Sequence, residues 1–480
     1  MNRKMIFYIT GEMVILEAIL LVLPLLVSLI YGESCALSFV FAIAAALALG
    51  GIMMLIFKPS TTVIYSKEGF VIVALSWIFM SCIGALPFVF SGEIPSYVDA
   101  LFETISGFTT TGASIVRDVE SMSKGIQFWR SFTHWVGGMG VLVLVMAVLP
   151  TTTDRSIHIM KAEMPGPVVG KLVPRVRQTA KILYLIYIGL TILQIIMLCF
   201  GGMSLFESSV HAFGTAGTGG FGIKADSLAG YSPYIQWVIT IFLILFGINF
   251  NIFFLILMRK FKSAFMSDEL WTYLGIIAVS VLIITANIYP MYQNLSDSFR
   301  ASSFQTMSIL STAGFSTADF NAWPALSKGI LMLLMFIGGC AGSTAGGVKI
   351  SRVIILFKSV RRELRRMIHP RSVSSLRLDG RNVDDQTING VGTYFAFYIG
   401  IIMVSFLLIS FEPFDFETRF SSVVACFNNV GPGFGAVGPM GSYADYSSFS
   451  KLVLSAAMLL GRLEIYPLIF AFSPSLWAKK

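Results

Sequence analysis

Long apolar runs separated by polar segments are the feature that most restricts how this chain can fold. Several of them exceed about 18 residues, the length at which a helix crosses the hydrocarbon core of a bilayer. Of the 480 residues, 55% are hydrophobic and only 12% are charged. Because a soluble protein could not hide so much apolar surface, the chain is predicted to be an all-α polytopic membrane protein.

Ten apolar segments can be drawn as predicted spans. The first has no small-residue cleavage site and is too long for the apolar core of a signal peptide, so we expect it to be retained. The segments are residues 5–30, 36–57, 70–90, 127–149, 182–201, 234–258, 271–290, 329–357, 391–411 and 451–471.

The charges between the segments predict the orientation of the chain. Basic residues dominate residues 151–181 and 349–390, whereas residues 91–125 and 412–451 hold more acids than bases. The basic segments are expected in the cytoplasm, and ten spans then place both termini there. Since the basic residues flank spans, the net charge of +8 does not indicate binding to nucleic acid.

Titratable residues form no recognisable catalytic or metal site in the sequence. The five cysteines and four histidines are scattered, without a disulfide framework or zinc-ligand spacing. No Ser/His or His/Asp/Glu constellation is visible, so we do not expect an enzyme.

A motif of glycines and small polar residues recurs four times. Each copy follows a run with helical apolar spacing that is too short to cross a bilayer. The chain is therefore predicted to repeat span, half-helix, glycine turn and span four times, after two extra spans. The copies are ETISGFTTTGAS (103–114), HAFGTAGTGGFG (211–222), QTMSILSTAGFS (305–316) and ACFNNVGPGFG (425–435).

The repeats divide the chain into five parts. Residues 1–66 form a predicted two-helix hairpin, and the four pore repeats are expected at residues 67–155, 156–262, 263–385 and 386–480.

Four such turns indicate an ion pore. Non-helical backbone at membrane depth survives only where protein or a water-filled cavity surrounds it. Turns gathered by pseudo-fourfold symmetry around a central pore could offer carbonyl oxygens in place of the water around a bare cation. Glycine permits the required backbone angles, and the C-terminal ends of the half-helix dipoles favour a cation. Ordinary external loops are the alternative, but four copies in register with the spans argue against them.

With TTTGAS, GTGGFG, STAGFST and NNVGPGFG, the chain resembles the Trk/Ktr/HKT superfamily of potassium transporters, over essentially its whole length. It is most similar to the bacterial TrkH-type membrane subunit, which also carries two additional N-terminal spans. The resemblance implies potassium uptake across the bacterial cytoplasmic (inner) membrane, with K⁺ as the transported ion and no organic cofactor.

The resemblance also implies one potassium filter with one glycine from each repeat. Some plant relatives replace the first glycine with serine and favour sodium, so Gly112 implies potassium. The fourth copy departs most, because Asn429 replaces threonine and Pro432 follows the glycine. The implied filter residues are Thr110, Thr111, Gly112, Thr218, Gly219, Gly220, Thr312, Ala313, Gly314, Asn429, Val430 and Gly431.

The stretch GGCAGSTAGGVK, residues 338–349, interrupts the expected span that starts at 329. A segment with so many glycines will not hold a straight helix. It resembles the family's intramembrane loop, which lies under the filter and obstructs the pore; a kink for close helix packing is the alternative. The implied gate residues are Gly338, Gly339, Gly342, Ser343, Thr344, Gly346 and Gly347.

Arg462 lies inside the last apolar segment, where a charge costs about 2.5–3.5 kcal/mol on insertion scales. In the family that the chain resembles, an arginine here lines the pore beside the loop, so we expect Arg462 to belong to the gate. A pair with Glu464 is the alternative, although residues at i and i+2 of a helix do not face each other. Lys349 is interpreted more simply, as the cytoplasmic end of the broken span.

The basic residues 358–381 predict contact with acidic lipid or with a cytosolic partner. The resemblance implies a homodimer and a separate nucleotide-binding regulatory ring of the TrkA type that docks on the basic cytoplasmic loops. A secondary transporter that couples potassium to sodium or protons is the alternative function. Against it, the repeats share one topology, and Glu12, Glu17 and Glu464 are the few acids within spans.

Overall fold

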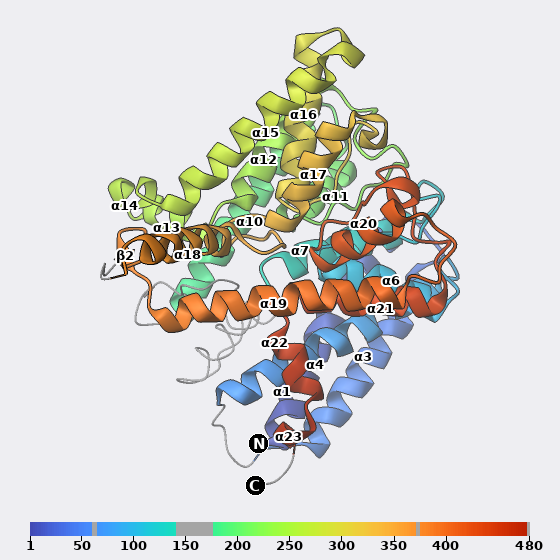
Figure 1. Ribbon diagram of the computed structural model, residues 1–480. Helices are drawn as coiled ribbons and strands as arrows, with labels where there is room; N and C mark the ends of the chain where they lie inside the picture. The colour runs from blue at the N-terminus through green and yellow to red at the C-terminus, as the bar shows by residue number, and fades with distance from the viewer. Residues whose placement is uncertain (60–64, 141–175, 371–374, 478–480) are drawn as a thin grey trace.

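The computed structural model describes residues 1–59, 65–140, 176–370 and 375–477, and helices dominate it (Figure 1). Several expectations lie outside the described residues. They are the end of the fourth predicted span (141–149), the basic residues 151–175, the boundary between residues 155 and 156, and the last two lysines.

The N-terminal part is built from α1 (Arg3–Leu20), α2 (Val22–Ile30) and α3 (Ala36–Ile56). Glycines let α1 and α3 approach closely, since a Cβ atom on Gly50 would lie 2.9 Å from the carbonyl oxygen of Gly11. Figure 1 shows these helices at one edge of the molecule, beside α4. The predicted pair of extra spans is confirmed.

Each of the four following units contributes a first span, a short helix and a second helix. The first spans are α4 (Ser66–Gly84) with α5 (Leu86–Phe90), α10 (Val176–Phe200), α15 (Asp268–Tyr292) and α19 (Asp385–Leu408). The short helices are α6 (Tyr97–Phe108), α11 (Leu205–Ala216), α16 (Leu295–Leu310) and α20 (Phe416–Phe427). The second helices are α7 (Lys124–Gly138), α12 (Pro233–Gly247), α17 (Ala325–Ile337) and α21 (Ser448–Arg462).

Polar caps begin the short helices, which we call pore helices. The side chains of Ser96, Ser204, Asn294 and Asp415 each accept a hydrogen bond from a backbone N–H of the first turn. Such caps satisfy N–H groups that have no partner within the helix. The four predicted half-helices are therefore confirmed.

Among the described residues, six helices, counting α1 with α2 and α4 with α5, are long and apolar enough to cross a membrane, and two bent pairs raise the number to eight. The expected segments 234–258 and 451–471 are not continuous helices. The first bends by 89° between α12 and α13 (Phe250–Leu257), and the second by 119° between α21 and α22 (Tyr466–Phe472).

Local residues explain both bends. Asn249 starts a new helix, because its side chain accepts a hydrogen bond from the Asn251 N–H at 2.9 Å. Glu464 and Ile465 have positive φ angles of 55° and 70°, which an α-helix cannot contain. The predicted spans at these two places are therefore broken by a bend.

The remaining elements surround the interrupted span. Helix α17 ends at Ile337, and the basic helix α18 (Ile350–Ile368) begins after the non-helical residues 338–349, as predicted. The other elements are α14 (Phe261–Phe265), η1 (Phe320–Ala322), β1 (Arg377–Leu378) paired antiparallel with β2 (Arg381–Asn382), η2 (Gly435–Val437) and α23 (Pro474–Trp477).

Candidate functional site

The four glycine turns share one backbone conformation. Two residues after each pore helix ends, a residue adopts a left-handed conformation: Thr110 (φ 55°), Thr218 (54°), Thr312 (59°) and Asn429 (57°). Two positions later stands a glycine with positive φ: Gly112 (79°), Gly220 (80°), Gly314 (76°) and Gly431 (93°). A left-handed residue with a Cβ is uncommon, so four at matching positions indicate a conformation that the surroundings enforce.

Hydrogen bonds repeat with the same regularity. The residue before each glycine donates its N–H to the carbonyl five residues earlier, at 2.8 Å in all four turns. The departures of the fourth copy, Asn429 and Pro432, therefore leave its backbone like the others. The pairs are Thr111 to Ser106, Gly219 to Gly214, Ala313 to Ser308 and Val430 to Ala425.

The turns form a closed ring, because the glycine of each turn packs closely against the backbone of the next turn. A Cβ on the glycine of one turn would collide with the carbonyl oxygen of the residue before the glycine in the next turn. These collisions run from Gly112 to Gly219, from Gly220 to Ala313, from Gly314 to Val430 and from Gly431 back to Thr111. The structure thus brings together turns from four distant parts of the sequence, and Gly431 closes the ring with Thr111 of the first repeat.

Side-chain oxygens at the left-handed positions add to this ring. The hydroxyl of Thr110 and the amide oxygen of Asn429 are buried without a hydrogen-bond partner among the described residues. The Asn429 amide nitrogen donates to the Thr111 hydroxyl at 2.9 Å, which ties the fourth turn to the first. Buried oxygens without partners are costly, and a bound cation would satisfy them.

The loop at residues 338–349 lies directly against the ring. Its Gly346 N–H donates to the Thr312 hydroxyl at 2.6 Å, and a Cβ on Gly346 would meet the Asn428 carbonyl. Its other end is held at the bend of the second repeat, where Cys340 N–H donates to the Gly247 carbonyl at 3.0 Å.

Most predicted gate residues shape this loop internally. A Cβ atom on Gly338 would collide with the carbonyl oxygen of Gly346, and a Cβ atom on Gly347 would collide with the backbone of Gly338. Ser343 donates to the Cys340 carbonyl at 2.6 Å. Gly339 packs on Ala345, while the Gly342 carbonyl accepts from Phe250 N–H at 3.0 Å. The loop is thus a compact fold of its own and not a simple helix kink.

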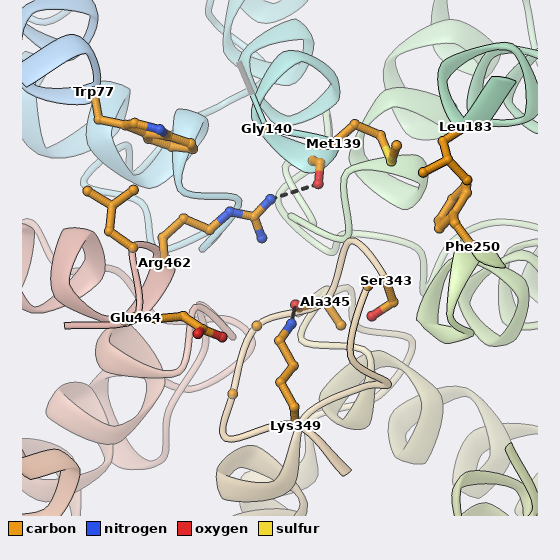
Figure 2. Close-up of a pocket in the computed structure, with 16 residues that line it drawn as sticks. Trp77, Met139, Gly140, Leu183, Phe250, Ser343, Ala345, Lys349, Arg462 and Glu464 are labelled. Carbon is orange, nitrogen blue, oxygen red and sulfur yellow. Dashed lines mark hydrogen bonds between the residues drawn. The ribbon is translucent and has the colours of Figure 1, made fainter. Parts of the chain in front are cut away.

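Arg462 joins this loop to the first repeat. Its guanidinium donates to the carbonyl oxygens of Thr344 at 2.8 Å, Gly137 at 2.5 Å and Gly138 at 2.7 Å. Figure 2 shows it at the edge of a cavity of about 50 Å³, opposite Lys349. On this scale the cavity has room for only a few water molecules.

Glu464 pairs with an arginine other than Arg462. It forms two hydrogen bonds with Arg352 of α18, at 3.0 and 2.6 Å. The interpretation of Lys349 as a simple cytoplasmic end was wrong, because its side chain is 3% exposed and its amine donates to the Ala345 carbonyl. A short loop closed by its own glycines leaves Lys349 facing inward.

Glu269 is a functional candidate that the sequence analysis missed. One of its carboxylate oxygens accepts from the Ala341 N–H at 2.7 Å and the Ser351 N–H at 3.1 Å, so it holds both sides of the loop. Its sequence signal, an acid in the first turn of α15, is common at helix starts and does not predict a distant contact.

Comparison with known proteins gives consistent matches over the whole chain. The TrkH family, described as a cation transport protein, matches residues 37–479. The Trk system potassium uptake protein TrkH of Salmonella typhimurium is 38% identical over 99% of this chain and 100% of its own. TrkG of Escherichia coli, with the same description, is 34% identical over 99% and 98%. The crystal structure of the potassium transporter TrkH from Vibrio parahaemolyticus superposes with a TM-score of 0.88, at 32% identity and full coverage of both chains.

Proposed function

The chain belongs to the TrkH family of cation transport proteins, which are not enzymes, and from this we propose that it takes up potassium through a channel-like pore. It is a membrane protein with several apolar spans. We place it in the bacterial cytoplasmic (inner) membrane with both termini inside, as the distribution of basic residues predicts.

The closed ring of four turns is the observation that carries the proposal. Each filter glycine packs against the carbonyl of the next repeat, so none can gain a Cβ without moving its neighbour. A ring of backbone carbonyls can replace the water of a partly dehydrated cation, and the C-terminal ends of the four pore helices add negative potential. We assign the ion site to the twelve filter residues predicted above.

Transport in this proposal needs no coupled ion. A membrane potential supplies about 2.3 kcal/mol per charge per 100 mV, enough to accumulate K⁺. The repeats share one topology, as a pore requires, whereas coupled transporters commonly use inverted repeats around a midplane site.

The loop at residues 338–349 and Arg462 form the proposed gate. The loop contacts the underside of the ring through Gly346 and Thr312, and Arg462 fastens it to α7 through carbonyl oxygens. A fixed cation beside the small cavity that these residues line also raises the energy of a passing K⁺. Opening would require the loop to leave the ring and Arg462 to give up its carbonyl partners.

Partners of the chain are proposed from the resemblance and from the charge pattern. The exposed residues Arg361, Arg365 and Arg366 of α18 offer a basic surface for a cytosolic nucleotide-binding ring or for acidic lipid. The homodimer also stays a prediction.

Cation flux into liposomes that contain the purified protein tests the function. Potassium, rubidium, sodium and lithium are compared under an imposed voltage without a gradient of any second ion. We expect potassium and rubidium to pass well ahead of sodium and lithium. Flux that needs a sodium or proton gradient would instead support a coupled transporter and overturn the pore.

A further inference from the structure

A buried histidine of α7 links two repeats directly behind the proposed filter. The Nδ1 atom of His134 lies 2.8 Å from the Gly107 carbonyl, and its Nε2 atom lies 3.3 Å from the backbone N of Phe221. A carbonyl can only accept and an amide N–H can only donate, so the ring carries its proton on Nδ1 and accepts at Nε2. His134 therefore ties the end of the first pore helix to the residue that follows Gly220.

This hydrogen bond fixes the direction of one filter carbonyl. The peptide between Gly220 and Phe221 is planar and trans, so its C=O points opposite to its N–H. Because the N–H points to His134 on α7, the Gly220 oxygen points away from α7. A Cβ on Gly219 would collide with the same imidazole, which places the ring immediately behind the turn.

Arg130, one helical turn earlier on α7, holds the next residues of the segment that follows Gly220. Its Nη1 donates to the Gly222 carbonyl at 3.0 Å, and its guanidinium carbon lies 3.6 Å from the centre of the Phe221 ring. Its Nε bonds Glu103 of the first pore helix at 2.5 Å. The side chains of Arg130 and Glu103 are 4% and 0% exposed, so the pair is shielded from solvent.

A comparison of the four turns explains why the second one needs this support. Nine residues before each filter glycine, the pore helices carry Glu103, His211, Gln305 and Ser422. Two of these side chains hold the strand of their own repeat, since Glu103 accepts from the Ser114 hydroxyl at 2.9 Å and Gln305 donates to the Ser316 hydroxyl at 3.2 Å.

The second turn lacks this internal contact. The ring nitrogens of His211 have no hydrogen-bond partner among the described residues. The serine that follows the filter glycine by two residues in the first and third turns is replaced by glycine in the second and fourth, Gly222 and Gly433. In the fourth turn the Ser421 hydroxyl instead accepts from the Phe434 N–H at 2.8 Å. The segment that follows Gly220 is instead held by two side chains of the first repeat, His134 and Arg130 of α7.

We propose that His134 and Arg130 are positioning residues for selectivity, which together hold the Gly220 carbonyl toward the ion. This inference rests on the proposed potassium filter. A carbonyl that can rotate adapts to a smaller ion, so the loss of this support lowers discrimination against sodium more than it lowers total flux.

The test measures the ratio of potassium to sodium flux in liposomes. His134→Leu removes both hydrogen bonds and is expected to lower the ratio about tenfold, the factor that corresponds to about 1.4 kcal/mol. His134→Gln, whose amide oxygen can still accept from the Phe221 N–H, is expected to lower it less. Trp135→Phe is the matched control, because it removes a 3.2 Å hydrogen bond from the same helix to Thr191 of α10, away from the filter.

A wild-type ratio in folded His134→Leu would overturn the inference. If that variant does not fold, the Arg130→Lys variant tests the inference instead. Lysine keeps the positive charge beside Glu103 but lacks the guanidinium group that donates to the Gly222 carbonyl. A lowered ratio in Arg130→Lys supports the inference, and an unchanged ratio overturns it. If the wild-type protein itself does not prefer potassium, the proposed filter fails instead.

Discussion

Single residues decide the backbone of the proposed filter. Gly112, Gly220, Gly314 and Gly431 combine a positive φ angle with a carbonyl of the next repeat at the place where a Cβ would stand. The repeated motif aligned these four glycines in the sequence, and the resemblance to the family implied their place in a filter. The sequence could not predict the inter-repeat contact, because contacts between residues so far apart in the chain leave no periodic signal in one sequence.

Replacing Gly112 with serine should weaken selectivity for potassium over sodium about tenfold, a change of about 1.4 kcal/mol. The new Cβ would push the Gly219 carbonyl out of the ring. The ratio of potassium to sodium flux in liposomes measures this effect.

Gly92→Ser is the matched control for this variant. Gly92 has a similar φ of 75°, but nothing lies within 4 Å of the place of its Cβ. The assignment of Gly112 to the filter would be wrong if both variants kept the wild-type ratio.

Replacing Arg462 with alanine should raise potassium flux by about tenfold or more, because hydrogen bonds from a charged donor contribute about 1.5–3 kcal/mol each and this variant removes three. The same assay measures the rate at fixed voltage. Arg419→Ala serves as control, since Arg419 donates to the Ser410 carbonyl but contacts no part of the loop. Equal potassium flux in the two variants would show that Arg462 is not part of the gate.

Helices could be predicted from the sequence where the length of an apolar run or the spacing of apolar residues indicates them. The spans and pore helices follow from apolar runs and from capping residues such as Ser204 and Asp415. The bends after α12 and α21 could not be predicted, because apolar residues continue on both sides of each bend. Likewise, the salt bridge between Arg352 and Glu464 joins α18 to the turn between α21 and α22, whose proximity only the fold creates.

Glu464→Gln should destabilise the protein by about 2 kcal/mol, since it leaves the buried Arg352 without its charged partner. Thermal unfolding in detergent should show a midpoint lowered by several degrees. Lys328→Gln breaks the more exposed pair with Glu417 and should change stability by only about 0.5 kcal/mol. A similar midpoint for both variants would mean that the Arg352–Glu464 pair does not hold α18 to the turn between α21 and α22.

Shortening the loop, by deletion within residues 338–347, should raise flux while selectivity for potassium is retained. The loop contacts the ring through Gly346 and Thr312, whereas the ring closes through contacts between its own turns. Measuring both the potassium flux and the ratio of potassium to sodium flux distinguishes an effect on the gate from an effect on the filter. A deletion that leaves the rate unchanged, in a protein that still folds, would show that the loop is not the gate.

The whole molecule consists of four similar units, whose turns close into one ring, and two additional spans, α1 with α2 and α3, which lie at its edge (Figure 1). No single repeat contains the proposed ion site, because each glycine contacts the following repeat and the fourth contacts the first. The fourfold pattern could be predicted from the sequence, since the motif recurs at a nearly constant interval. The unequal support of the second turn, by His134 and Arg130, appears only in the assembled molecule.

The most direct test of the central claim is to locate a potassium-like ion by the anomalous scattering of Rb⁺ in crystals of the protein. The four-repeat ring predicts a rubidium peak on the common axis, within coordination distance of backbone oxygens from the turns at Gly112, Gly220, Gly314 and Gly431. A rubidium peak that contacts only one or two repeats, or none at the ring at concentrations that support flux, would contradict a single four-glycine site.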